Sequence, residues 1–445
     1  GSIGVVGVIA ITFFNVSGGP WGSEDIFSTV GPMMGTAGLL LFAVFFSLPQ
    51  CLATAELTCA FPSNGGYSVW VRESFGDFWG VQECYWGFVS GVLDSAVYPV
   101  LICDTLLQLA GHTDAGVYEV WLYRMTVALL LSLPTFVSVH TVPALLTAFA
   151  ITTGVPVMAF IAVGARSMSP KVWLQKTDGP VQFGKFINVC FWNMEGFDSI
   201  SSCTTLIKEP KERTITRGLL AALLIVTVQY TLVLLVAAAY GPDVARMPWQ
   251  EWNDGSLPSI GCAMGSCMGG FLLLASLVGN AGQYLSEFIE DSYMLQGAAD
   301  VGLVPRIFSS RMPNSGAPWV ANVFQILLVS VITLFDFSDI LVFDNCFTAM
   351  QVILEFCAFF WLRYSEPDLP RPYRVPWPFV GLFFSALFLL VVVLYHSFSK
   401  SWNVALVNTC AFAVGVPYGL WVQRKSKEAE KRGGRSCLDE LLEED

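Results

Sequence analysis

Four carboxylates lie in segments of the sequence that are otherwise apolar enough to cross a bilayer. Asp94 lies in one such segment, Glu195 and Asp198 in a second, and Glu287 in a third, with almost no Lys or Arg at the same depth. An ionisable side chain at membrane depth costs at least about 2.5–3.5 kcal/mol, so it persists where it faces a cavity, an ion path or a partner charge. Carboxylates without basic partners need a proton or a cationic ligand, and the pattern predicts a site that binds one or both.

The stretch Phe191–Asp198 is the centre of this pattern. It places Asn193, Glu195 and Asp198 inside an apolar segment. Gly196 weakens a helix there, because glycine is about 1 kcal/mol worse than alanine in a helix interior. We therefore predict a broken helix around a polar site, with Asp198 on the same face as Glu195 if the helix resumes.

Other readings of the acidic residues stay open. Asp94 precedes Tyr98 by one helical turn, so the pair fits a hydrogen-bonded structural unit as well as a cation or proton site. Glu290 and Asp291 lie closer to the predicted inner end, where we expect them to be solvated or to tether the helix. We expect Glu56 and Glu355 to be inner-end or packing residues.

Composition places the whole chain in the membrane class. Of its 445 residues, 54% are hydrophobic and only 13% are charged, with a mean hydropathy of +0.60. This is more apolar surface than a soluble domain of this length buries. Apolar runs of about 20 residues predict about twelve membrane helices, hence an all-α integral membrane protein. Their predicted ranges are 3–29, 35–59, 78–109, 120–138, 142–165, 183–207, 215–240, 260–296, 317–335, 338–362, 377–397 and 402–423.

Basic residues in the connections predict the orientation. With a cytoplasmic N-terminus, sixteen Lys and Arg fall on the inner side and seven on the outer side, which accounts for all 23. The positive-inside rule then places both termini in the cytoplasm of a multi-pass protein, and we expect the plasma membrane. The first residues carry no basic leader, so we expect no signal peptide and a natural N-terminal tail that is absent from this sequence.

Two predicted helices are interrupted at equivalent places. Residues Asn15–Gly22 put three glycines and a proline inside the first span, as Asn193–Gly196 interrupts the sixth. Such breaks are typical of five-plus-five inverted-repeat transporters, whose half-helices end at a midplane site. The alternative is a pair of unrelated kinks. The predicted division is a first repeat over 1–165, a second over 183–362, two further helices over 377–423 and a cytoplasmic tail over 424–445.

Pro20 bears on the substrate. An unwound helix offers backbone N–H groups to an anionic group, but proline has none to donate. We therefore expect a substrate with ammonium groups and no carboxylate that must be recognised. Tyr98, Trp192 and Tyr284 lie on the spans that carry the acids, and an ammonium over an aromatic ring gains about 0.5–2 kcal/mol.

Several motifs spread over nearly the whole chain have a familiar form. They are SGGPWGSED at 17–25, AEL at 55–57 with FPSNGGY at 61–67, SGVLD at 90–94 with YPV at 98–100, FWN at 191–193 with DSI at 198–200, GAADVGLVP at 297–305 and PDLPRPYRVP at 367–376. Together they resemble the eukaryotic polyamine uptake transporters of plants and trypanosomatids. That family is the polyamine/proton symporter branch of the amino acid–polyamine–organocation superfamily. The last two motifs are shared across the superfamily, whereas the first and third are more specific to the branch.

The resemblance implies roles for individual residues. It implies substrate contacts at Gly18 and Gly19, and a gating aromatic at Trp192. It also implies substrate and proton handling at Asp198 and a substrate-facing position for Glu287. The plant relatives tend to have an amide where this chain has Glu195, so the binding mode departs here. The predicted substrate-binding residues are Gly18, Gly19, Asp94, Tyr98, Trp192, Asn193, Glu195, Asp198, Tyr284 and Glu287, and the predicted proton-coupling residues are Asp94, Glu195, Asp198 and Glu287.

These observations predict a proton-coupled transporter that imports polyamines such as putrescine and spermidine by alternating access. The alternatives are a cationic amino acid transporter or exchanger and a non-transporting amine sensor. An enzyme is disfavoured, because His112, His140 and His396 lie in different segments without ligand spacing. We expect the proton as coupling ion with no cofactor. The expected partners are a small cationic polyamine and the lipid bilayer, with no nucleic acid.

Overall fold

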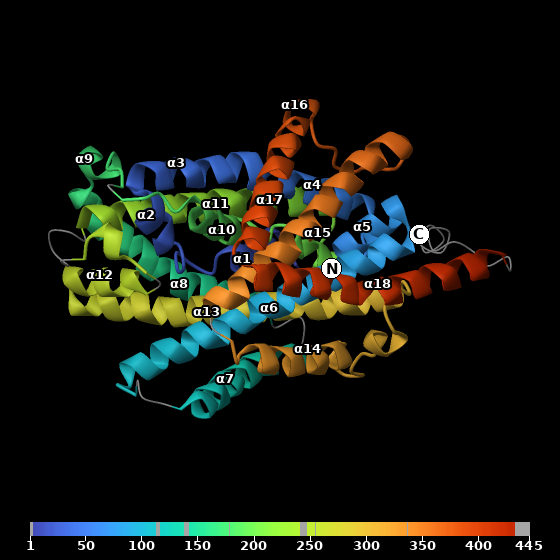
Figure 1. Ribbon diagram of the computed structural model, residues 1–445, viewed down its shortest axis with the longest axis horizontal. Helices are drawn as coiled ribbons and strands as arrows, with labels where there is room; N and C mark the ends of the chain where they lie inside the picture. Colours follow the sequence, from blue (N-terminus) through green and yellow to red (C-terminus); the bar gives the residue numbers. More distant parts are fainter. Residues whose placement is uncertain are drawn as a thin grey trace.

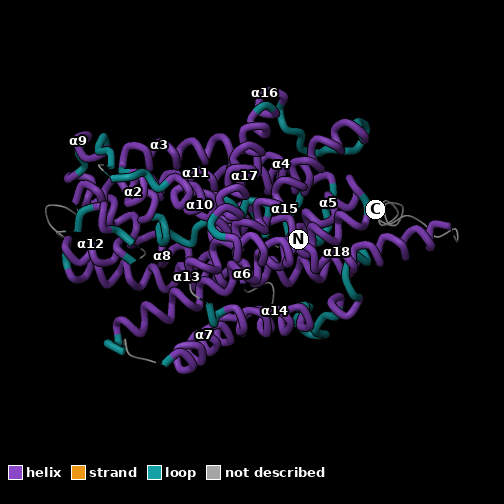
Figure 2. The backbone as a smooth tube through the Cα atoms, viewed as in Figure 1, coloured by secondary structure: helices purple, strands orange, loops and turns teal. Residues whose placement is uncertain are grey.

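The computed structural model describes residues 3–112, 116–137, 142–177, 179–240, 247–253, 255–335 and 337–431. This part of the chain contains helices and loops but no named strand (Figure 2), and Ile3 and Ile207 form an isolated bridge. Eight helices are long and apolar enough to cross a membrane, and two more apolar helices are shorter. The predicted all-α membrane architecture is confirmed.

Each of the twelve predicted spans has a helical counterpart. In chain order these are α1 (Val5–Val16) with α2 (Glu24–Val30); α3 (Pro32–Phe42) with the π-helix η1 (Ala43–Ser47) and α4 (Leu48–Ala60); α6 (Asp77–Leu109); α7 (Val117–Val137); α8 (Val142–Gly164); α10 (Phe183–Met194) with the 3-10 helix η3 (Ser199–Leu206); α11 (Lys211–Tyr240); α12 (Ser256–Met264) with α13 (Ser266–Asp300); α14 (Trp319–Ile332); α15 (Phe337–Ser365); α17 (Leu382–Ser399); and α18 (Trp402–Lys431). The short connecting elements are α5 (Gly66–Phe75), η2 (Ala165–Ser167), α9 (Pro170–Trp173), η5 (Trp249–Glu251), η6 (Arg306–Ser309) and α16 (Trp377–Val380).

The two predicted helix breaks are present and lie against each other. α1 ends at Val16, and α10 ends at Met194. Gly196 has a φ of +96°, which residues with a side chain rarely adopt. A Cβ at Gly196 would also lie 2.7 Å from the carbonyl oxygen of Asn15. Glycine is therefore required at this position both by its backbone conformation and by the contact between the two breaks.

Two details differ from the sequence prediction. After the second break, Ser199–Leu206 forms a 3-10 helix instead of resuming as an α-helix, because its Ser and Thr side chains bond to nearby backbone, as Thr204 does to the Ser201 carbonyl. The predicted span 260–296 is two helices separated at Gly265, whose φ is +149°. The second of them, α13, runs on to Asp300 along the long axis of the molecule (Figure 1).

The core lies around α6, which packs against both α13 and α15. In the most apolar window of α6, 78% of the residues are buried inside the protein, compared with 22% for α7 and 17% for α18. α7 and α14 pack together along one edge of the molecule (Figure 1). The peripheral helices present large apolar side chains outward, as a bilayer requires, while α6 lies at the centre and positions the polar site.

Candidate functional site

A small cavity at the centre of the helices is lined by seven carboxyl groups. Its volume is about 30 Å³, room for one or two water molecules. The lining residues are Tyr67, Gly87, Ser90, Gly91, Asp94, Glu195, Gly196, Asp198, Ser199, Glu287, Glu290, Asp291, Asp344, Thr348 and Gln351. The four carboxylates singled out from the sequence, Asp94, Glu195, Asp198 and Glu287, therefore meet in one place.

Asp94 is held by two aromatic residues. The Tyr98 hydroxyl, one helical turn away on α6, donates to one carboxylate oxygen. The Trp192 indole Nε1 donates to the other oxygen at 2.9 Å. Tyr98 also accepts a long bond from Gln283 at 3.4 Å. The predicted Asp94–Tyr98 pair is thus present, and Asp94 lines the cavity as well.

α13 contributes three acids from one face. Glu287, Glu290 and Asp291 are spaced three and four residues apart, which brings them together on one side of a helix. Asp291 accepts a hydrogen bond from Gln325 of α14 at 2.6 Å. The expectation that Glu290 and Asp291 are solvated was wrong, because they are only 5% and 1% exposed. α13 ends at Asp300, beyond the predicted end at 296, so these residues lie farther from the C-terminal end of their helix than predicted.

Asp198 occupies a more polar corner of the cavity. Gln50 of α4 donates to its Oδ1 at 2.8 Å, and Gln351 of α15 donates to its Oδ2 at 3.0 Å. Gln351 also donates to Glu355 Oε1 at 3.2 Å, so one amide links the Asp198 and Glu355 carboxyls. Because η3 is not an α-helix, Asp198 does not share a helical face with Glu195. The turn at Gly196 brings both residues to the cavity instead.

Glu195 lies at the break itself, in extended backbone with φ −107° and ψ 179°. It is partly exposed to the cavity, whereas the other six carboxyls are buried. Asp344 of α15 completes the set and accepts from Ser90 and Thr348. Sequence reasoning missed Asp344, although Asp344, Thr348, Gln351 and Glu355 recur at four, three and four residues along an apolar helix. That periodic polar stripe was the available signal.

The cavity has no matching positive charge. Among the residues that the structure describes, no Lys, Arg or His forms an ion pair with any of the seven carboxyl groups. Nor does any group of three or more His, Cys, Asp or Glu within that part have an arrangement suited to a metal ion. Seven like charges in so small a volume repel strongly, so the site is stable only with bound protons or with cationic ligands.

Trp192 separates this cavity from a second, larger one. The second cavity has a volume of about 630 Å³ and is lined in part by Asp25, Lys185, Trp192 and His396. We call it the vestibule. Because the Trp192 indole both lines the vestibule and bonds to Asp94, it lies between the two spaces.

The remaining predicted site residues do not line the acidic cavity. Gly18 and Gly19 adopt φ values of +54° and +135° in the first break, where Gly18 packs against Gln283. Asn193 donates to the Gly22 carbonyl at 3.2 Å and so ties the two breaks together. The hydroxyl of Tyr284 lies 2.7 Å from Ser132 Oγ of α7, which directs the ring away from the acids.

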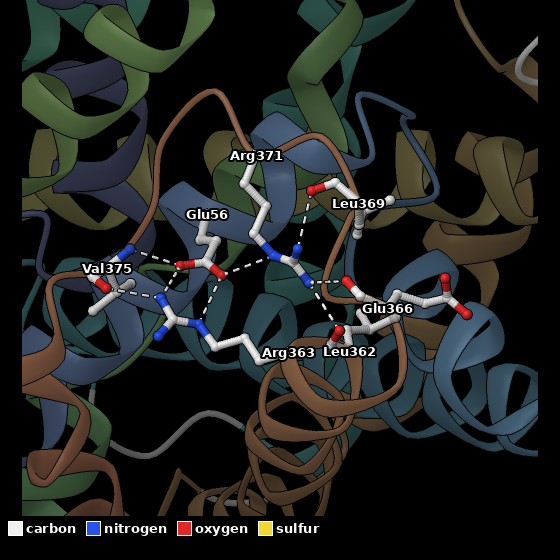
Figure 3. A network of polar contacts seen from close by, with 7 residues as sticks. All are labelled: Glu56, Leu362, Arg363, Glu366, Leu369, Arg371 and Val375. Carbon is white, nitrogen blue, oxygen red and sulfur yellow. Dashed lines mark hydrogen bonds and ion pairs between the residues drawn. The ribbon is translucent and has the colours of Figure 1, made fainter.

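Residues from the other predictions are placed elsewhere. His396 lines the vestibule, and His112 lies 3.4 Å from Glu119 at the surface. His140 and the tail from 432 onward lie outside the described residues. Glu56 is a packing residue, as expected: it binds Arg363 and Arg371 and the backbone N–H of Val375 (Figure 3).

Comparisons with known proteins agree with this architecture. The family model described as amino acid permease matches residues 3–416. The polyamine transporter RMV1 of Arabidopsis thaliana is 32% identical over 441 residues, covering 97% of this chain and 86% of that protein. The polyamine transporter PUT1 of Oryza sativa subsp. japonica is 31% identical over 421 residues, covering 93% and 77%. A probable agmatine/putrescine antiporter, AguD of Lactococcus lactis, is 24% identical over 371 residues, covering 76% and 75%.

Proposed function

This chain belongs to the amino acid permease family, and we propose that it carries polyamines across the membrane in symport with protons. The observation that supports this proposal most is the acidic cavity, in which seven carboxyl groups face one another without a described cationic partner. Relatives named polyamine transporters match almost the full length of the chain. A polyamine supplies several positive charges on one flexible chain and so matches this charge distribution.

The charge of the cavity favours a polyamine over a cationic amino acid. An arginine or lysine substrate brings a carboxylate, which needs N–H donors or a cation at its binding site. Pro20 removes one backbone donor from the first break, and the acidic lining repels a further negative charge. Amine groups find carboxylates from α6, α10, α13 and α15, so one extended molecule can be held at several points.

The structure corresponds to a contracted site in the proposed transport cycle. A cavity of about 30 Å³ is too small for a diamine, so substrate entry requires helix movement. We place Trp192 as the gate to the vestibule, and we assign the vestibule to the outer side and both termini to the cytoplasm of the plasma membrane, following the distribution of basic residues. Rocking of one helix bundle against the other then exposes the site to the inside.

The charge of the cavity also determines how protons take part in the proposed cycle. A site with many carboxyls and few amines retains some protons when the amine is bound, and different occupancy states hold different numbers of protons. Asp94, Glu195, Asp198 and Glu287 are the proposed coupling residues. An inward proton gradient favours the loaded carrier outside and release inside, which drives accumulation.

Uptake by purified protein in proteoliposomes tests this proposal. Labelled putrescine and spermidine are offered with an imposed inward proton gradient, with no gradient, and with excess unlabelled arginine or lysine. We expect accumulation above equilibrium only with the gradient, and little competition by the amino acids. Uptake that ignores the gradient would contradict symport, and strong competition by arginine would favour a cationic amino acid carrier.

A further inference from the structure

A polar seam continues from the acidic cavity between α6 and α15. On α6, Glu83, Gly87, Ser90 and Asp94 recur at four, three and four residues, so they share one face. On α15, Asp344, Thr348, Gln351 and Glu355 have the same spacing. Ser90 bonds to Asp344 and lies beside Thr348, and a Cβ on Gly87 would lie 3.1 Å from Gln351. The two faces therefore run antiparallel against each other, which brings Glu83 opposite Glu355.

Glu83 and Glu355 are buried beyond the cavity lining. They are 0% and 1% exposed. Neither oxygen of Glu83 has a hydrogen-bond partner within the described residues. No ion pair of the described residues includes either carboxyl. An unpartnered carboxylate in such surroundings is too costly to persist as an anion, so Glu83 carries a proton.

The hydrogen bonds also fix where the proton of the next group lies. Both oxygens of Asp198 accept bonds from amide donors, Gln50 and Gln351, as an ionised carboxylate does. Gln351 Nε2 also donates to Glu355 Oε1 at 3.2 Å, so one amide links the two carboxyls. Two buried carboxyls this close repel each other when both are ionised, so the proton is on Glu355, which has fewer donors than Asp198.

We propose that Asp198, Glu355 and Glu83 form a proton relay that leads away from the acidic cavity and carries the coupling proton of the proposed symport. In each step the receiving carboxylate gains the proton and the donor becomes the anion. Because Glu83 and Glu355 both hold a proton at rest, the sequence begins when Glu83 releases its proton. Glu355 then passes its proton to the Glu83 carboxylate, and Asp198 passes a proton taken up from the cavity to the Glu355 carboxylate. α6 begins at Asp77, about two turns beyond Glu83, and the proton leaves at that end.

The groups that face the relay are other carboxyls, thiols and phenols. Asp198 is within electrostatic range of Glu195 and Glu290 in the cavity, of Cys51 on α4 and of Tyr67 on α5. Glu83 is in range of Cys84 and Cys357, and Tyr418 of α18 is in range of Cys84. Thiols and phenols are neutral near pH 7. The nearest basic residue along α15, Arg363, is already paired with Glu56.

The test measures protons and amine separately in proteoliposomes that contain a pH-sensitive dye. Adding spermidine outside is expected to acidify the lumen with the unmodified protein. Glu83→Gln keeps the shape of a protonated glutamate but cannot release a proton. We expect it to lose the acidification while retaining exchange of labelled for unlabelled spermidine. Glu355→Gln is expected to behave in the same way, and Glu83→Asp to restore acidification.

Controls separate this proposal from the function on which it rests. Asp368→Asn changes an exposed acid far from the seam and should match the unmodified protein. Gel filtration and the thermal shift with spermidine must match before a variant is compared. Equal acidification per amine by Glu83→Gln, or loss of exchange together with acidification, would overturn the relay alone. Spermidine entry without acidification by the unmodified protein would overturn both the symport and the relay, and absence of spermidine transport would overturn the proposed function as a whole.

Discussion

Buried carboxyl groups have different partners at Glu56 and in the acidic cavity. Glu56, on α4, is bound by the guanidinium groups of Arg363 and Arg371 and by the backbone N–H of Val375 (Figure 3). Its side chain is 1% exposed, and the two arginine side chains are 7% and 4% exposed. In the cavity, seven carboxyl groups lie together with only hydroxyl, amide and indole donors among their described partners.

The comparison shows two kinds of buried carboxyl. Glu56 stabilises the fold, whereas the carboxyls of the acidic cavity are proposed to bind a ligand. Burial lowers the pKa of Arg371, and the neighbouring Glu56 carboxylate opposes that shift, so the buried charges of the cluster have partners of opposite sign within the protein. Arg371 also donates to the Leu362 and Glu366 carbonyls, which fixes the loop after α15 (Figure 3). The described residues give the cavity no such basic partners, so its carboxyls need bound protons or a cationic ligand.

The largest effect is expected from breaking the balanced cluster. Glu56→Gln leaves the two buried guanidinium groups without their carboxylate, and removing one partner of a buried ion pair costs about 3–5 kcal/mol. We expect a large fall in the yield of folded protein and in its melting temperature, measured by fluorescence-detected gel filtration and thermal unfolding in detergent. A variant as stable as the unmodified protein would show that the Glu56 cluster does not stabilise the fold.

The opposite result is expected in the cavity. Glu195→Gln removes one of seven mutually repelling groups, so stability should be unchanged or higher. A hydrogen bond to a charged group contributes about 1.5–3 kcal/mol, so spermidine affinity should fall about ten- to a hundredfold. Thermal shift titrations with spermidine measure both quantities, and Glu366→Gln, at an exposed acid, is the control. Lower stability with unchanged spermidine affinity would show that Glu195 supports the fold and does not bind the amine.

A smaller effect is expected from filling the cavity without changing its charge. A Cβ at Gly91 would lie 1.9 Å from Asp291 Oδ1, so an alanine must displace the acid, at a cost of about 1–3 kcal/mol. Gly91→Ala should lower the thermal shift that spermidine produces. Gly154→Ala is the matched control, because no atom lies within 4 Å of its Cβ position. Equal shifts for both variants would place the amine elsewhere.

The smallest effect is expected in the vestibule. Lys185 Nζ lies 2.8 Å from Asp25 Oδ2, and the lysine side chain is half exposed. Such a pair contributes at most about 1 kcal/mol, so Lys185→Met should leave the melting temperature nearly unchanged. It leaves Asp25 free to attract amines, and initial uptake at low salt should rise slightly. A large loss of stability would show that this ion pair stabilises the fold, as the Glu56 cluster is expected to do.

Sequence reasoning located part of the site because ionisable residues are rare in apolar helices. Asp94, Glu195, Asp198 and Glu287 met that criterion and lie together. Glu290 and Asp291 were misplaced because α13 continues past the predicted end of this span to Asp300. The twelve spans were predictable from hydropathy, whereas a break caused by a single glycine is not visible in an apolar average.

The partners of these acids could not be predicted, because they come from distant parts of the chain. Gln50 reaches Asp198 across 148 residues, and Trp192 reaches Asp94 across 98. Spacing along one helix carries no information about such contacts. The division into inverted repeats stays a prediction, as do the individual roles of the site residues.

The hydrogen bond between Trp192 and Asp94 would couple the entry of an amine into the acidic cavity to its binding there. In the proposed cycle the Trp192 indole moves aside to admit an amine, and this movement removes the N–H that Asp94 accepts at 2.9 Å. The carboxylate oxygen is vacated at the moment when an incoming ammonium group can occupy it. An ammonium N–H then replaces the indole N–H as the donor to Asp94. A molecule without an N–H group would displace the indole without restoring this hydrogen bond. Selection of the substrate would therefore begin at Trp192, before the substrate reaches the remaining acids.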